Sequence, residues 1–332
     1  MDSALIILVF LIGVALLFDM LNGLHDAANS IAAIVSTRVL SPKMAVLLAG
    51  FFNFIAFTVF PLNVAHTIGK GIISPDLVTD QVIFGALMGA IVWNLLTWWR
   101  GIPSSSSHAL VGGLVGAGVA HAGVHAIVWN GLSKTALAIV LSPTMAFSMS
   151  LLLILLVSWA LVKATPSLSD RMFRVLQFVS ASWLSLSHGG NDAQKTMGII
   201  TVLLYSHGAL KGEFTPPFWV ILSCQAAMGI GTMFGGWKIV RTMGSKITRL
   251  TPMYGFCAEA AAATTLTVAT QFGIPVSTTQ TISGAIVGVG ASRRLSAVRW
   301  IVAKDIVLAW FITLPCAALM AAGFYWLGGF IL

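Results

Sequence analysis

Four short polar segments interrupt a long apolar chain, and two of them contain a carboxylate, Asp26 or Asp192. Carboxylate and amide oxygens are good ligands for hard cations, and each acid stands among residues that could complete such a site. The neighbours are Asn22, His25 and Asn29 in the first segment, and His188, Asn191, Gln194 and Lys195 in the second. The two segments are therefore candidate cation sites. The alternative is a structural ion pair, for instance between Asp192 and Lys195.

The other two polar segments are runs of hydroxyl residues that follow a proline. Residues 101–107 read Gly-Ile-Pro-Ser-Ser-Ser-Ser and residues 273–279 read Gly-Ile-Pro-Val-Ser-Thr-Thr. Proline stops the preceding helix, and one or two hydroxyls cap the next one, so three or four exceed what a cap needs. Free N–H groups, the positive end of the helix dipole and extra hydroxyl donors together form an anion site. Its candidate residues are Ser104, Ser105, Ser106, Ser107, Ser277, Thr278 and Thr279.

The composition places these segments inside a membrane. Of the 332 residues, 58% are hydrophobic and 8% are charged, against roughly 25% charged in soluble domains. Continuous apolar stretches such as 4–17 exclude a soluble fold and also the alternating pattern of barrel strands. A carboxylate in the middle of a membrane costs roughly 2.5 to 3.5 kcal/mol. Asp26 and Asp192 therefore require a functional or structural reason.

The chain contains an internal repeat. The Gly-Ile-Pro run that begins at Gly101 recurs at Gly273, and eight of the eighteen positions aligned from there are identical. The carboxylate segment at 24–27 recurs at 190–193. A polar linker at 163–174 separates the copies. We therefore predict a first repeat at 1–165 and a second at 166–332, which together form one transmembrane domain.

Most of the positive charge can lie on one side of the membrane. Fourteen of the eighteen Lys and Arg residues fall in loops that threading places together. The positive-inside rule assigns that side to the cytoplasm and explains the net charge of +8 without a nucleic-acid partner. The threading gives five crossings per half, with 81–99, 102–122, 252–271 and 273–292 counted as separate crossings. Both termini then lie outside.

Because five is odd, the second half enters the membrane in the opposite sense. We therefore expect an all-α integral membrane protein of about 10–12 membrane segments, built as inverted repeats with broken or re-entrant helices, which is typical of secondary transporters. The first crossing of each half spans about 35 residues, or roughly 52 Å of helix against a hydrocarbon core of ~30 Å. We expect these helices to break at 23–26 and at 189–192.

The chain resembles a known family at four motifs in the same order. The segments 18–30 (FDMLNGLHDAANS) and 187–198 (SHGGNDAQKTMG), with both Gly-Ile-Pro runs, are similar to the paired signatures of bacterial members of the inorganic phosphate transporter (PiT) family. The resemblance implies secondary transport of inorganic phosphate driven by sodium ions or protons. The loop between the halves is short here, and Gln280 stands where related bacterial sequences often have histidine.

We assign the polar residues to two sets on this basis. The coupling cation, sodium or a proton, is expected at Asp26, Asn29, Asp192, Asn22 and Glu259; Glu259 could equally be a structural acid. The anion is expected at the seven hydroxyl residues with Asn191 and Lys195; Asn191 also fits the cation set. Moving a phosphate dianion into a cell whose interior is electrically negative costs roughly 4.6 kcal/mol per 100 mV of membrane potential. Two co-transported cations cancel this electrical cost.

Several alternatives stay open at this point. A sulfate permease of the same family would share these features, although only a protonated phosphate can donate a hydrogen bond to a carboxylate. A channel would show the same polar breaks without coupling. A remote alternative is an intramembrane serine hydrolase with Ser106 or Ser107 beside His108, but adjacent helical residues do not face each other.

We therefore predict a transporter and not an enzyme, with no cofactor besides the co-transported ion. The expected partners are inorganic phosphate, the coupling cation, the lipid bilayer of the plasma (inner) membrane and, as an open alternative, further copies of the chain.

Overall fold

The computed structural model describes residues 3–332, and the regular structure in this range is helical, as predicted. The two halves follow the same order of elements. The first half contains α1 (Ser3–Ser36), α2 (Pro42–Ile55), α3 (Asn63–Gly71), α4 (Asp80–Arg100), α5 (Ser106–Ala122) and α6 (Trp129–Ala160). The second contains α7 (Pro166–Ser206), α8 (Phe218–Phe234), α9 (Trp237–Arg241), α10 (Pro252–Gln271), α11 (Thr278–Arg293) and α12 (Trp300–Ile331). A π-helical turn, η4 (Thr242–Lys246), extends α9.

The chain is a multi-pass membrane protein. Among the described residues, five helices, α1, α4, α5, α6 and α12, are long and apolar enough to cross a membrane. Two further pairs pass the same test but are sharply bent: α2 and α3 meet at 82°, and α8 and α9 with η4 meet at 63°. Broken helices are therefore present in equivalent places of the two halves.

The breaks expected inside the first helix of each half are wrong. Helices α1 and α7 are continuous through Gly23 and Gly189. These glycines allow close helix contact instead, because a Cβ on Gly23 would clash with the backbone of Met228 in α8, and a Cβ on Gly189 would clash with the backbone of Asn53 in α2. The breaks lie between α2 and α3 and between α8 and α9.

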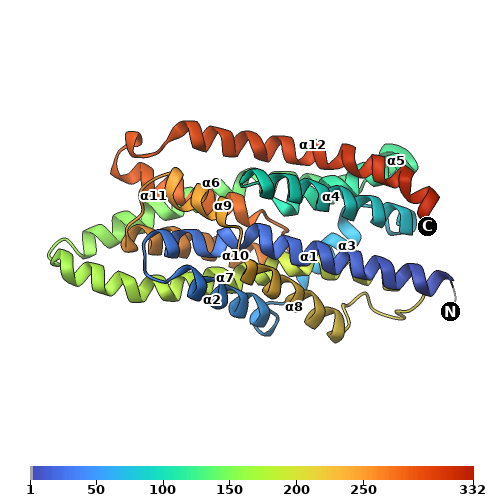
Figure 1. The fold of residues 1–332 in the computed structure, drawn as a ribbon, viewed down its shortest axis with the longest axis horizontal. Helices are drawn as coiled ribbons and strands as arrows, with labels where there is room; N and C mark the ends of the chain where they lie inside the picture. Colours follow the sequence, from blue (N-terminus) through green and yellow to red (C-terminus); the bar gives the residue numbers. More distant parts are fainter. Residues whose placement is uncertain (1–2) are drawn as a thin grey trace.

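Helices α4 and α5 form a hairpin along α12. The open end of the hairpin lies at the C-terminal part of α12, where His121 Nδ1 is 2.9 Å from the Tyr325 hydroxyl. The indole of Trp93, nearer the closed end, donates to Thr313 Oγ1 at 3.2 Å. Helices α10 and α11 form the equivalent hairpin along α6. Figure 1 shows α4 and α5 in the half of the molecule that holds both termini and α11 toward the opposite end.

The closed ends of the two hairpins meet in the middle of the bundle. Ser107 Oγ at the start of α5 donates to the carbonyl of Val276, just before α11, at 3.3 Å. The threading of 81–99 and 102–122, and of 252–271 and 273–292, as separate crossings is therefore wrong. Hydropathy cannot tell a buried hairpin from two crossings, because neighbouring helices cover the hairpin's apolar surface. Besides its hairpin, each half contains α1, α2–α3 and α6 or their counterparts.

Each hairpin packs closely on the long helix of the other half. Gly112 in α5 contacts the backbone of Leu314 in α12, and Gly284 in α11 contacts the backbone of Pro143 in α6. Small residues let helix backbones approach within a membrane. This contact fixes the start of α5 and the start of α11 at the same level of the bundle.

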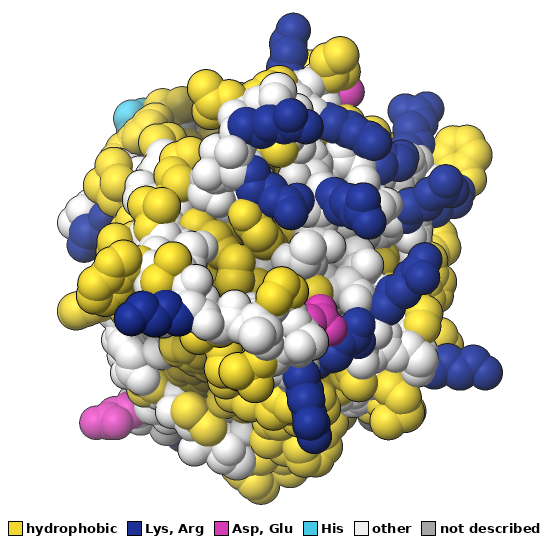
Figure 2. Space-filling model, turned by 90° about the vertical axis from the view of Figure 1, so that its left-hand side faces the viewer, with side chains coloured by type: hydrophobic (Ala, Val, Ile, Leu, Met, Phe, Trp, Pro, Cys, Tyr) yellow, Lys and Arg dark blue, Asp and Glu magenta, His cyan; other side chains and the backbone are white. Residues whose placement is uncertain are grey.

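The two ends of the bundle differ in charge. Both termini lie at one end (Figure 1), and Figure 2 shows Lys and Arg side chains gathered over the other end. The connections from α1 to α2, from α6 to α7 and from α11 to α12 lie at this basic end. The charge separation agrees with the predicted segregation of Lys and Arg; the sidedness in the membrane stays a prediction.

Candidate functional site

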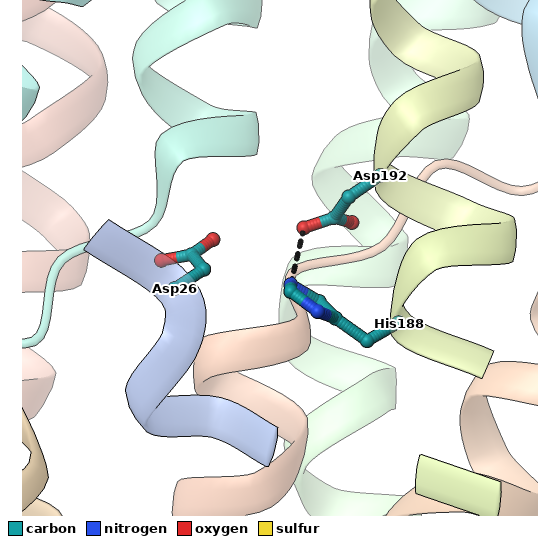
Figure 3. Close-up of side chains that lie close together, drawn as sticks. All are labelled: Asp26, His188 and Asp192. Atoms are coloured by element: carbon teal, nitrogen blue, oxygen red, sulfur yellow. Dashed lines mark ion pairs between the residues drawn. The ribbon is translucent and has the colours of Figure 1, made fainter. Parts of the chain in front are cut away.

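The two repeated carboxylates lie together at the point where the hairpins meet. Asp26 on α1, with His188 and Asp192 on α7, offers ligand atoms that all lie within 4.8 Å of one another. Figure 3 shows the carboxylates of Asp26 and Asp192 on facing helices, with the ring of His188 one turn from Asp192. All three side chains are buried. The sequence repeat thus places two acids from different halves in one site.

The carboxylate of Asp26 is held by hydroxyls and a histidine. Ser106 Oγ lies 2.5 Å from Asp26 Oδ2 and 2.6 Å from Asn22 Oδ1. Thr279 donates to Asp26 Oδ1 at 3.3 Å, and His25 Nδ1 lies 2.8 Å from the same oxygen. Hydroxyls from both hairpins therefore converge on this acid, and no lysine contacts it among the described residues.

The carboxylate of Asp192 has an ammonium partner. Lys195 Nζ lies 2.5 Å from Asp192 Oδ1, His188 Nε2 lies 3.3 Å from Oδ2, and Thr278 donates to Oδ2 at 3.1 Å. Lys195 also contacts the Ser107 hydroxyl and donates to the Val276 carbonyl at 3.0 Å. The structural ion pair considered from the sequence is present, and the same ammonium reaches both hairpin ends.

The hydroxyl runs divide into caps and site residues. Ser105 caps α5 by accepting from the His108 amide at 3.2 Å, and Ser277 caps α11 by accepting from the Gln280 amide at 3.3 Å. Asn29 Nδ2 donates to Thr278 and Thr279, at 3.0 Å in each case. Ser106, Ser107, Thr278 and Thr279 therefore exceed the needs of capping. Ser106, Thr278 and Thr279 contact the acids and Ser107 contacts Lys195. The first turns of both helices present positive dipole ends there.

Three predicted residues lie outside this centre. Ser104 donates to Thr97 at 2.9 Å. Asn191 donates to Thr270 at 2.9 Å and to the Ile274 carbonyl at 3.3 Å, and thereby ties the second Gly-Ile-Pro turn to α7. Glu259 accepts from Ser180 at 2.6 Å and from Gln177 at 3.3 Å.

Glu259 of α10 forms a separate polar cluster with Ser180 and Gln177 of α7. Its partner Ser180 precedes Asp192 on α7, and the two positions are about 18 Å apart along the helix axis. Glu259 is fully buried, like the central acids. Any cation that Glu259 binds would occupy a different site from one bound at Asp26 and Asp192.

The sequence reasoning missed several supporting residues. Asn53 of α2 donates to Thr232 at 2.8 Å and places its Oδ1 3.3 Å from His188 Nδ1. Thr97 of α4 lies 3.0 Å from His25 Nε2. The sequence signal that could have identified them is an amide or hydroxyl side chain inside an otherwise apolar helix. Their partners lie far away in the chain, so spacing alone could not identify them.

The position of His108 opposes a hydrolase. His108 Nδ1 lies 3.2 Å from Gln280 Nε2, its counterpart in the second hairpin. Ser106 instead contacts Asp26 and Asn22, and Ser107 contacts Lys195 and the Val276 carbonyl. Neither serine has the histidine as its hydrogen-bond partner, so a serine and base pair is not assembled.

Comparison with known proteins decides the family. A model described as "Phosphate transporter family" matches residues 22–321. The chain belongs to the phosphate transporter family. A Rhizobium meliloti (strain 1021) protein named "Probable low-affinity inorganic phosphate transporter" is 67% identical over 324 residues, covering 97% of each chain. A Bacillus subtilis (strain 168) protein of the same name is 43% identical and covers 98% of each chain.

A solved structure supports the fold of this phosphate transporter. The structure described as "The sodium-dependent phosphate transporter" is similar with a TM-score of 0.88 and 27% identity, and the match covers 98% of this chain and 100% of that one. The relatives and the family are transporters and not enzymes, which confirms the prediction that this chain is a transporter and not an enzyme. The family resemblance seen in the sequence motifs is also confirmed.

Proposed function

We propose that this phosphate transporter is a secondary active symporter that imports inorganic phosphate together with sodium ions or protons. The observation that carries the proposal is the meeting of two hydroxyl-lined helix starts at two buried carboxylates, Asp26 and Asp192. The sodium-dependent structural neighbour supports sodium as the first cation to test. The protein would need no resident cofactor.

The hydrogen bonds at the acids suggest how binding of the two ions is linked. Ser106 and Thr279 contact Asp26, and Thr278 donates to Asp192. A cation bound to these carboxylates competes with the hydroxyl donors for the same oxygens. The released hydroxyls, with the N–H groups at the starts of α5 and α11, can then donate to phosphate. Cation binding therefore raises anion affinity, and by linkage the anion raises cation affinity.

The chemistry around the hairpin ends favours phosphate over sulfate. The hydroxyls that would bind the anion are already in contact with Asp26 and Asp192, so an anion placed there lies beside a carboxylate. Protonated phosphate can donate a hydrogen bond to that carboxylate, whereas sulfate has no proton at neutral pH. Lys195 contributes a positive charge between both hairpin ends.

Alternating access would expose this centre to each side in turn. The two hairpins approach it from opposite ends, and each packs on the long helix of the other half. In this proposal the halves 1–165 and 166–332 are inverted repeats that rock against each other. The basic end lies in the cytoplasm of the cell, and both termini lie outside the plasma (inner) membrane.

Uptake of radiolabelled phosphate into proteoliposomes tests the proposal. We expect accumulation above equilibrium when an inward sodium or proton gradient is imposed, with each gradient applied separately. Arsenate should compete and sulfate should compete weakly. Equilibration without accumulation under either gradient would instead identify a channel, and strong competition by sulfate would remove the preference for a protonated anion.

A further inference from the structure

A cavity of about 540 Å³ opens at the side of the bundle between the end of α4, the start of α12 and η4. Its volume is within the range of ligand pockets in proteins. Arg100, Lys246 and Asp305 lie along it, and all three side chains are exposed. Neither Arg100 nor Lys246 forms an ion pair with any residue of 3–332. The cavity therefore carries a net positive charge that the protein does not neutralise.

The walls of the cavity are largely apolar, and several of their side chains are exposed at the side of the bundle. Leu96 is 40% exposed, Leu308 is 53% exposed and Ile312 is 40% exposed. The exposed tryptophans Trp99 and Trp300 stand beside Arg100 and at the start of α12, and tryptophan is enriched at the headgroup level. An occupant that matches these surroundings has an anionic head and hydrocarbon chains.

The equivalent place in the other half also has two cations but no arginine among the described residues. Two smaller cavities lie there, one of about 200 Å³ between α6 and α10 and one of about 390 Å³ between the end of α3 and the start of α6. There Phe272 precedes the second Gly-Ile-Pro run as Arg100 precedes the first, and Lys134 holds the place in α6 that Asp305 holds in α12. Lys70 and Lys134 line the cavity of about 390 Å³, and among the described residues no arginine lines either cavity. Paired cations therefore recur in both halves, and the arginine and the larger volume distinguish the cavity at the basic end.

We propose that the cavity between α4, α12 and η4 binds an anionic phospholipid. The headgroup phosphate lies between Arg100 and Lys246, and the acyl chains lie along Leu96, Leu308 and Ile312. Basic pockets between transmembrane helices on the cytoplasmic side are suited to such headgroups. A bound lipid would come from the leaflet at the basic end of the bundle, where Figure 2 shows apolar side chains among the Lys and Arg residues.

The floor of the cavity connects the lipid to the transport site. Thr97 lines the cavity, accepts from Ser104 at 2.9 Å and lies 3.0 Å from His25 Nε2. His25 in turn contacts Asp26. The Gly-Ile-Pro turn at 101–103 also lines the cavity. A lipid seated there therefore packs against the segment that positions Ser104–Ser107, and we expect it to raise the uptake rate; only this rate effect depends on the proposed function.

Lipid retention by the purified full-length protein tests the site directly. The protein is exchanged into detergent with equal phosphatidylglycerol and phosphatidylcholine, and bound lipids are counted by native mass spectrometry. We expect preferential retention of phosphatidylglycerol, reduced about fivefold for each cation removed in Arg100→Gln and Lys246→Gln. Ala309→Trp, which fills the cavity without changing its charge, should also reduce retention.

The matched control is the double substitution Arg299→Gln and Lys304→Gln. Both residues are exposed near the start of α12 but do not line the cavity, so retention should stay at the wild-type level. An equal loss in this control would show diffuse attraction to the basic end and would overturn the proposal. Lipid retention at the wild-type level in the Arg100→Gln/Lys246→Gln protein would also overturn the proposal. The same holds if Ala309→Trp changes the oligomeric state while lipid retention stays unchanged.

Phosphate uptake in vesicles separates the lipid from free phosphate. In pure phosphatidylcholine, the Arg100→Gln/Lys246→Gln protein should have the wild-type KM for phosphate. Added phosphatidylglycerol should raise uptake by wild type and not by this variant. A raised KM in pure phosphatidylcholine would assign the cavity to the transported anion instead. If no protein accumulates phosphate, the proposed function fails while the retention result still decides the lipid site.

Discussion

The two carboxylate centres occupy equivalent places in the two halves, yet their surroundings differ. Asp26 is held by Ser106, Thr279 and His25, whereas Asp192 contacts the ammonium of Lys195 at 2.5 Å. Because the ammonium of Lys195 already compensates the charge of Asp192, this acid attracts a second cation less strongly than Asp26 does. In the proposed symporter, Asp26 would supply most of the attraction for the coupling cation, and the Asp192–Lys195 pair would join cation binding to the anion site through Ser107.

The largest effects are expected from removing either acid. Asp26→Asn and Asp192→Asn should each abolish gradient-driven phosphate uptake in proteoliposomes, because a neutral amide cannot replace a carboxylate ligand.

The two variants, Asp26→Asn and Asp192→Asn, should differ in stability. Asp192→Asn leaves Lys195 buried without its anion, which costs about 3–5 kcal/mol, whereas no lysine contacts Asp26 among the described residues. Thermal unfolding in detergent measures this difference. Normal uptake by either variant would remove that acid from the scheme, and equal stability loss would contradict the comparison.

A combined substitution sharpens the role of the ion pair. Asp192→Asn with Lys195→Met removes both charges, so the double variant should recover most of the stability that Asp192→Asn loses. Uptake should stay absent, because the anion site has lost its ammonium. Thermal unfolding and uptake are measured on the same preparations. Recovery of uptake in the double variant would show that the pair has only a structural role.

An intermediate effect is expected at the start of α5, where a site hydroxyl and a cap are adjacent. Ser106→Ala removes a donor from the proposed anion site and should raise the KM for phosphate about tenfold or more, since hydrogen bonds to charged groups contribute about 1.5–3 kcal/mol. Ser105→Ala removes the cap and should cost about 1 kcal/mol of stability with a smaller change in KM. Initial uptake rates across phosphate concentrations, with thermal unfolding, separate the two. A larger KM effect at Ser105 would reverse our division into cap and site.

The repeat in the sequence was sufficient to predict that the two acids and the two hydroxyl runs lie together. Matching offsets paired Asp26 with Asp192 and Ser106 with Thr278, and equivalent elements of the two halves meet in the bundle. The motif residues are polar within apolar surroundings, so their type and spacing carry the information. Asn53 and Thr97 were missed because each is a single polar residue whose partner lies on a helix far away in the sequence.

The path of the chain was less predictable. Glycines at 23 and 189 suggest breaks in the sequence, but they serve close packing on Met228 and Asn53. A glycine in a helix has both uses, and only the neighbouring helix decides between them. The hairpins likewise resemble crossings, because mean hydropathy does not distinguish a helix buried by protein from a helix in contact with lipid.

The smallest effect on phosphate binding is expected at the acid farthest from the centre. Glu259 lies with Ser180 and Gln177, about 18 Å along α7 from Asp192. Glu259→Gln places an amide group against two hydrogen-bond donors, so we expect a stability loss of about 1–3 kcal/mol. The KM for phosphate should stay within about twofold of wild type, because hydrogen bonds at that distance do not reach the anion. If Glu259 binds a second cation, the cation dependence of the uptake rate will shift while this KM stays constant. A KM for phosphate that rises as much as in Ser106→Ala would contradict this separation. It would place Glu259 in contact with the central site in a second conformation of the protein.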